Sequence, residues 1–167
     1  DKATSDLFAV NRAQKVSGEE WLRVRFENPE EIVEIQNRES RALWPSVISF
    51  CNTFAEDGEK HIIEGVGLIP SLVARMEGRP RHMVWVGDAE KGHAEAMIRH
   101  ALENPQQDWL GADGFTREKI EAMANFVRAM SRYFESEAGK YSLPYIELDH
   151  DNFDESAERV IEFLMLS

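Results

Sequence analysis

The sequence has one cysteine, no long apolar run and a shortage of basic residues. The single cysteine, Cys51, excludes an internal disulfide framework and is typical of a reducing, cytoplasmic compartment. Its neighbours Ile48, Phe50 and Phe54 predict a small buried side chain rather than a nucleophile. No stretch approaches the roughly 20 apolar residues that span a membrane. The sequence therefore predicts no membrane partner.

Acidic residues outnumber basic ones by 31 to 19, which gives a formal net charge of −12. A nucleic-acid partner would require a basic face, so this balance argues against one. A few arginines can still converge in one pocket of an acidic protein and bind a small anion. We therefore expect a small-molecule substrate and no nucleic acid, and the sequence leaves the oligomeric state open.

Strand-like and helix-like segments alternate along the 167 residues, of which 43% are apolar. This length and content suit one compact domain. The apolar segments 61–66, 81–88 and 143–148 predict three short strands. Strands that alternate with helices favour a parallel α/β sheet. Three strands are few for this many helices, so part of the sheet is expected to be missing.

The predicted helices have recognisable start signals. Asn28 is a predicted N-cap before Pro29, and Pro45 predicts a break or kink further along. Thr116 precedes a long helix whose apolar residues recur at three- and four-residue steps. The other predicted helices are a short one entered at Pro70, one over 89–103 and one over 153–166.

The order of these segments resembles that of the P-loop small-molecule kinases, which include uridine, gluconate and 2-phosphoglycerate kinases. The resemblance rests on DKATSDLF at the start, HIIEGVGLIP, HMVWVGD, IRHALENPQQDWL and YSLPYIELDHDNFDESAERVIEFL. It implies a three-layer α/β/α fold with a parallel sheet, over a single domain spanning 1–167. It also implies a helical acceptor or lid region at about 3–54 and a lid loop at about 104–114. The implied cofactors are ATP and Mg²⁺.

The sequence departs from this family in one large respect. The phosphate loop G-x-x-x-x-G-K-[S/T] does not occur in the 167 residues. In the family, the strand that carries the loop lies between the strands that 61–66 and 81–88 resemble. We therefore expect that a strand–loop–helix–strand segment of roughly thirty residues precedes Asp1.

Glu64 is the leading candidate for a catalytic residue. At the end of a parallel strand it would face the crevice where α/β proteins bind ligands. By the resemblance it would hold Mg²⁺ through a water or orient the acceptor hydroxyl. The alternative is an edge-strand glutamate that points to solvent or pairs with an arginine.

The resemblance implies roles for further charged residues. Asp1 would accept the proton of the acceptor hydroxyl, and Arg99 would close over the transferred phosphate. The alternatives are a simple terminal residue for Asp1 and an exposed helix pair with Glu95 for Arg99. The predicted ligands of the anionic acceptor are Arg12, Arg38 and Arg41, and those of the nucleotide are Arg128, Arg132 and Asp149. A solvated helix face is the alternative for these arginines.

The sequence thus favours an ATP-dependent phosphotransferase that acts on a small hydroxylated or phosphorylated metabolite. Two alternatives stay open. One is a non-catalytic α/β domain that binds a nucleotide or another ligand, with which the acidic surface and the lack of an obvious nucleophile are compatible. The other is a nucleotide hydrolase without a dedicated acceptor.

Overall fold

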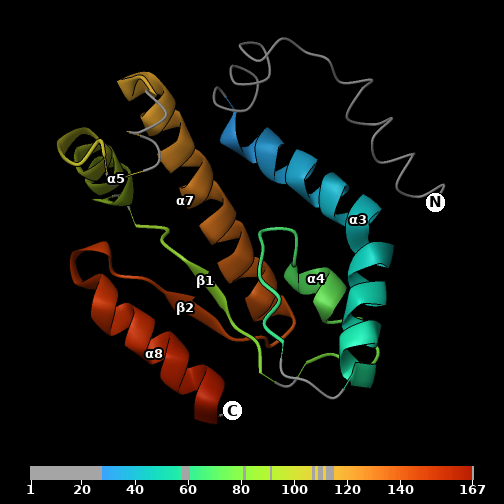
Figure 1. The fold of residues 1–167 in the computed structure, drawn as a ribbon. Helices are drawn as coiled ribbons and strands as arrows, with labels where there is room; N and C mark the ends of the chain where they lie inside the picture. The colour runs from blue at the N-terminus through green and yellow to red at the C-terminus, as the bar shows by residue number, and fades with distance from the viewer. Residues whose placement is uncertain are drawn as a thin grey trace.

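A computed structural model describes residues 28–57, 61–80, 82–90, 92–106, 108, 111 and 115–166. The elements in chain order are α3 (Pro29–Asp57), α4 (Pro70–Val73), β1 (Trp85–Gly87), α5 (Gly92–Glu103), α7 (Arg117–Lys140), β2 (Tyr145–Glu147), the 3₁₀ helix η1 (His150–Asn152) and α8 (Phe153–Leu166). Figure 1 shows α7 at the centre, with α3 on one side, the two strands on the other, and α8 beside β2.

The strands β1 and β2 form a parallel pair, with Trp85 opposite Tyr145 and Gly87 opposite Glu147. The connection between them runs through α5 and α7, because parallel strands need a long crossover. The expected three-layer α/β/α sheet is wrong for the described part of the chain, which is mostly helical and holds only this two-stranded sheet.

The segment 61–66 is the reason that the sheet is smaller than expected. It forms no strand, and Ile62 is 96% exposed although its apolar pattern predicts burial. Gly65 has φ +151°, a backbone conformation that favours glycine, and its carbonyl accepts the N–H of Leu68 at 3.1 Å. The chain therefore turns where the predicted strand was to end and pairs with neither β1 nor β2.

Most of the predicted helices are present in the structure. The long helix after Thr116, the short one at Pro70 and the closing one over 153–166 are confirmed as α7, α4 and α8. The predicted helix over 89–103 begins later, at Gly92. Pro45 lies inside one continuous helix, α3, which changes direction part-way along in Figure 1. A proline kink explains this bend, since proline removes one helical hydrogen bond.

Two apolar clusters lie towards opposite ends of α7. The larger one contains Val73, Trp85, Ala138 and Leu143 and joins α4 and β1 to the end of α7. The smaller one contains Ile98, Ala101 and Ile120 and joins α5 to its beginning. Burial of apolar surface therefore holds one end of α7 against β1 and α4 and the other end against α5. In the described ranges, none of the helices combines the length and the hydrophobicity of a membrane-spanning segment.

The start of α7 provides a first prediction. The hydroxyl oxygen of Thr116 accepts the N–H of Lys119 at 3.4 Å and so satisfies a backbone donor that the helix leaves open. We expect Thr116→Ala to lower the free energy of unfolding by about 1 kcal/mol. Thr116→Ser keeps the acceptor and is the control. Equal urea midpoints for the alanine variant and the parent protein would contradict a capping role.

Candidate functional site

The residue after β1, Asp88, is buried and fixed on two sides. Its backbone N–H donates to the Ser131 hydroxyl of α7 at 3.0 Å, and its Oδ2 lies 2.6 Å from Nδ1 of His93 in α5. A buried carboxylate is costly unless it is paired or hydrogen-bonded, and His93 meets that need here. These contacts lock the carboxyl end of β1 to both crossover helices.

Glu147, the last residue of β2, organises the same edge of the sheet. Its Oε1 accepts the backbone N–H of Ala89 at 2.6 Å, and its Oε2 accepts the Tyr145 hydroxyl. Its carbonyl oxygen accepts Nη2 of Arg159 from α8 at 2.8 Å. Burial, followed by the hydrogen bond to Glu147, raises the pKa of Tyr145. Tyr145 therefore stays a neutral donor to this carboxylate.

Two adjoining hollows lie between α3 and α7, and we call them together the arginine groove. The first has a volume of about 280 Å³ and is lined by Glu30, Val33, Asn125, Arg128, Ala129, Arg132 and Tyr133. The second has a volume of about 620 Å³ and is lined by Val33, Glu34, Asn37, Arg38, Arg41, Tyr133 and Glu137. Val33 and Tyr133 line both hollows, so these two residues mark the border between them.

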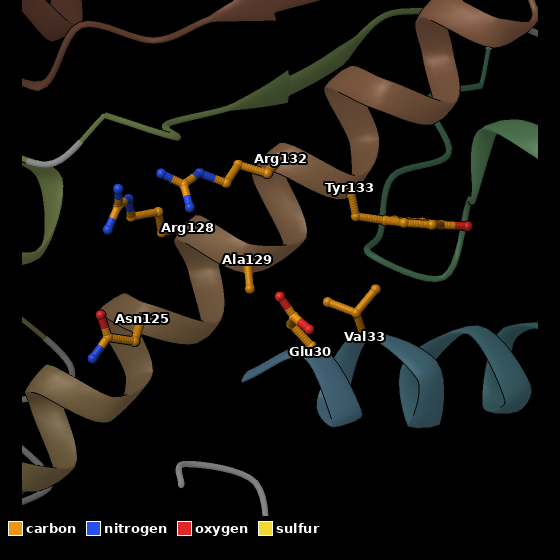
Figure 2. Close-up of a pocket in the computed structure, with 7 residues that line it drawn as sticks. All are labelled: Glu30, Val33, Asn125, Arg128, Ala129, Arg132 and Tyr133. Carbon is orange, nitrogen blue, oxygen red and sulfur yellow. The ribbon is translucent and has the colours of Figure 1, made fainter. Parts of the chain in front are cut away.

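The first hollow places two arginines together. Arg128 and Arg132 are four residues apart on α7, and Figure 2 shows their side chains extending in the same direction, away from Tyr133. Like charges at this spacing repel each other, and among the described residues Glu30 is the one carboxylate that lines this hollow. An anion between the two guanidinium groups would relieve the repulsion and accept their forked donors.

Arg128 also connects this hollow to the sheet. Its Nε donates to the carbonyl oxygen of Ala89 at 3.0 Å, just beyond the end of β1. Ligands of parallel α/β sheets bind outside the carboxyl ends of the strands. The two arginines therefore stand beside the sheet edge where a ligand is expected.

The second hollow is closer to balance in charge. Among the described residues, Arg38 and Arg41 line it together with two carboxylates, Glu34 and Glu137. Burial raises the pKa of Tyr133, so its hydroxyl is uncharged near neutral pH. This hollow offers donors to a polar ligand but a weaker positive field than the first.

The structure brings together four of the predicted site residues, namely Arg38, Arg41, Arg128 and Arg132. It does not show the remaining ones at the groove. Glu64 is exposed in the segment before α4, and Arg99 is exposed on α5. Asp149 is exposed, and its carboxylate caps η1 by accepting the N–H of Asp151 at 2.9 Å. Asp1, Arg12 and most of the predicted lid loop at 104–114 lie outside the described residues.

The described residues do not provide a metal centre at Glu64. Within the described ranges, no group of three or more His, Cys, Asp or Glu side chains is placed to hold a metal ion. Mg²⁺ needs only one or two carboxylates when substrate phosphates complete its shell, so a role for Glu64 stays a prediction. The arginines of the first hollow, in contrast, suit the phosphate groups of a ligand such as ATP.

Sequence reasoning missed three residues of this region. Asp88 is the last residue of a predicted strand and precedes a predicted helix, which is the position where α/β sites place polar groups. Glu147 and Tyr145 are two residues apart in a predicted strand, so they share one face of it. These spacings were visible, but the pairing of β2 with β1 was needed to show that Glu147 reaches Ala89.

In comparisons with known proteins, no family model matches the chain, and neither the curated proteins nor the solved structures yield a match.

Proposed function

We propose that the protein binds a phosphorylated small molecule in the arginine groove and takes part in phosphoryl transfer from ATP. The observation that carries the proposal is the pair Arg128 and Arg132, which extend to the same side of α7 with Arg128 anchored on Ala89 at the sheet edge. Forked guanidinium groups are well suited to phosphate oxygens. The formal net charge of −12 disfavours anions overall, so binding one requires a local group of arginines such as this.

Phosphoryl transfer is the reaction that best suits a site made of positioning cations. The transferred group carries its charge on peripheral oxygens, so a protein contributes mainly by orienting it and neutralising that charge. ATP would supply the phosphoryl group. Arg128 and Arg132 would hold phosphate oxygens at the sheet edge, while Arg38 and Arg41 would orient the polar remainder of a ligand across Tyr133. The roles of Glu64, Asp1 and Arg99 stay predictions.

Removing the guanidinium of Arg128 tests the proposal. Arg128→Met keeps most of the side-chain stem but removes the charge and all donors. We expect the affinity for pyrophosphate and for Mg·ATP to fall by about 10- to 100-fold, because a charged hydrogen bond contributes about 1.5–3 kcal/mol. Isothermal titration calorimetry at fixed salt measures this fall.

The matched control is Arg117→Met. Arg117 lies on the same helix, is exposed and lines neither hollow, so the change in net charge is the same. Its affinity should stay within about twofold, since an exposed distant charge is screened by salt. Equal losses in both variants would show a general charge effect and would reject the groove as the site.

A non-catalytic ligand-binding domain is the second candidate. The observation that favours it is the position of Glu64 and Arg99, since both are exposed and neither lines the groove. Measuring ADP release with Mg·ATP separates the two functions. Release that depends on an added metabolite supports the transferase, release without any acceptor supports a hydrolase, and binding without release supports the second candidate.

A further inference from the structure

We propose that Glu147 is a positioning residue for the anion site, which it serves by fixing the backbone that holds Arg128. This inference rests on the proposed function, because it concerns the same two arginines. Glu147 lines neither hollow of the arginine groove, so it acts through other groups rather than on the ligand.

The connection runs through a single residue, Ala89. Its N–H donates to Oε1 of Glu147 at 2.6 Å, and its carbonyl oxygen accepts Nε of Arg128 at 3.0 Å. The residue after β1 therefore has one backbone group held by β2 and another held by α7. Both hydrogen bonds are made by the backbone of Ala89. A displaced Glu147 carboxylate would therefore move Ala89, and with it the carbonyl oxygen that accepts Arg128.

The position of Glu147 is itself fixed by several contacts. Its backbone lies in register with Gly87, and its carbonyl oxygen accepts a hydrogen bond from Arg159. Its second carboxylate oxygen accepts the Tyr145 hydroxyl. A carboxylate with both oxygens occupied has few rotamers left, so it presents Oε1 to Ala89 at a fixed point. Supporting contacts of this kind orient the side chains that meet a ligand.

The consequence is a preorganised Arg128. With Nε occupied by Ala89, the guanidinium plane is set before a ligand arrives, and its remaining N–H groups are available to an anion. Preorganisation reduces the entropy that binding must overcome for each ordered side chain. Glu147 thereby strengthens anion binding even though its own negative charge would disfavour it.

A double-mutant cycle tests this role with pyrophosphate as the probe. We expect Glu147→Ala to weaken binding by about 2- to 12-fold, the range that corresponds to ordering one long side chain. Glu147→Gln keeps an acceptor for Ala89 and should bind within about twofold of the parent protein, which a simple charge effect would not produce. In an Arg128→Met background, Glu147→Ala should cause no additional loss, since the side chain to be positioned is gone.

Thermal unfolding of each variant checks that the fold is retained. If Glu147→Ala does not fold, Glu147→Asp replaces it, because the shorter side chain withdraws the acceptor from Ala89 while its charge stays. Equal losses from the Glu147 change in the presence and absence of Arg128 would overturn the inference. A fall in pyrophosphate affinity for Arg128→Met but not for the Glu147 variants would also overturn it, although the proposed function would then stand. No loss on Arg128→Met would reject both.

Discussion

Replacing Gly87 with alanine is expected to lower the free energy of unfolding by about 3 kcal/mol, at the upper end of the usual cost of overpacking. A Cβ at this position would lie 2.5 Å from the Tyr145 hydroxyl oxygen and 2.7 Å from both Cβ and Oγ of Ser131. Atoms cannot share that space. Ser131 is attached directly to the α7 backbone, so the helix itself would have to move away from β1.

The displacement would also break polar contacts. Ser131 accepts the N–H of Asp88, and Tyr145 donates to Glu147, so the methyl group of Gly87→Ala disturbs both partners of the sheet edge. For a chain of this size, a loss of about 3 kcal/mol corresponds to a fall in melting temperature of roughly 6–12 °C. Differential scanning calorimetry measures it directly.

Gly139 offers a matched control. It lies in α7, and a Cβ there meets nothing within 4 Å. Glycine in a helix is less favourable than alanine by up to about 1 kcal/mol, and less than that in the last turn, where Gly139 lies, so Gly139→Ala should leave the stability unchanged or raise it slightly. A similar melting temperature for both alanine variants would show that the space beside Gly87 is not filled as described.

The second large effect is expected at Trp85. This side chain is 7% exposed and belongs to the larger apolar cluster, where Val73, Ala138 and Leu143 surround it. Its Nε1 donates to the carbonyl oxygen of Leu68 at 2.7 Å. Truncation to alanine would leave a cavity between β1, α4 and α7, so we expect a loss of about 3–5 kcal/mol.

Two further variants divide this effect into packing and hydrogen bonding. Trp85→Phe keeps an aromatic ring but removes the donor to Leu68, which should cost about 1–3 kcal/mol. Val86→Ala changes the neighbouring residue, which is 41% exposed, and should cost about 0.5 kcal/mol. Chemical denaturation curves give the three free energies of unfolding. If Trp85→Ala were no less stable than Val86→Ala, a core position for Trp85 would be contradicted.

The parts of the fold that could be predicted from the sequence are those fixed by local pattern. The α7 periodicity, the Thr116 cap and the proline at the start of α4 each depend on residues within a turn or two of one another. The segment 61–66 shows the limit of such reasoning. Its isoleucines satisfy a strand pattern, but a strand exists only where another strand supplies hydrogen bonds, and none is paired with it in the described part of the chain.

The candidate site likewise has a part that local sequence pattern predicts and a part that it does not. Charge and spacing drew attention to Arg128 and Arg132, because two arginines one helical turn apart must share a face. Nothing local indicated that Arg128 contacts Ala89, or that Glu147 reaches the same residue. These contacts depend on how β1, β2 and α7 pack together.

The hydrogen bond between Ala89 and Glu147 joins residues 58 positions apart in the chain. Closing a flexible loop of that length costs about 3–4 kcal/mol of chain entropy, apart from a constant term. The helices α5 and α7 lie within this loop and pack on each other, so their prior association shortens the flexible part that must close. We therefore expect the parallel pair to form late in folding, after α5 and α7 have packed together.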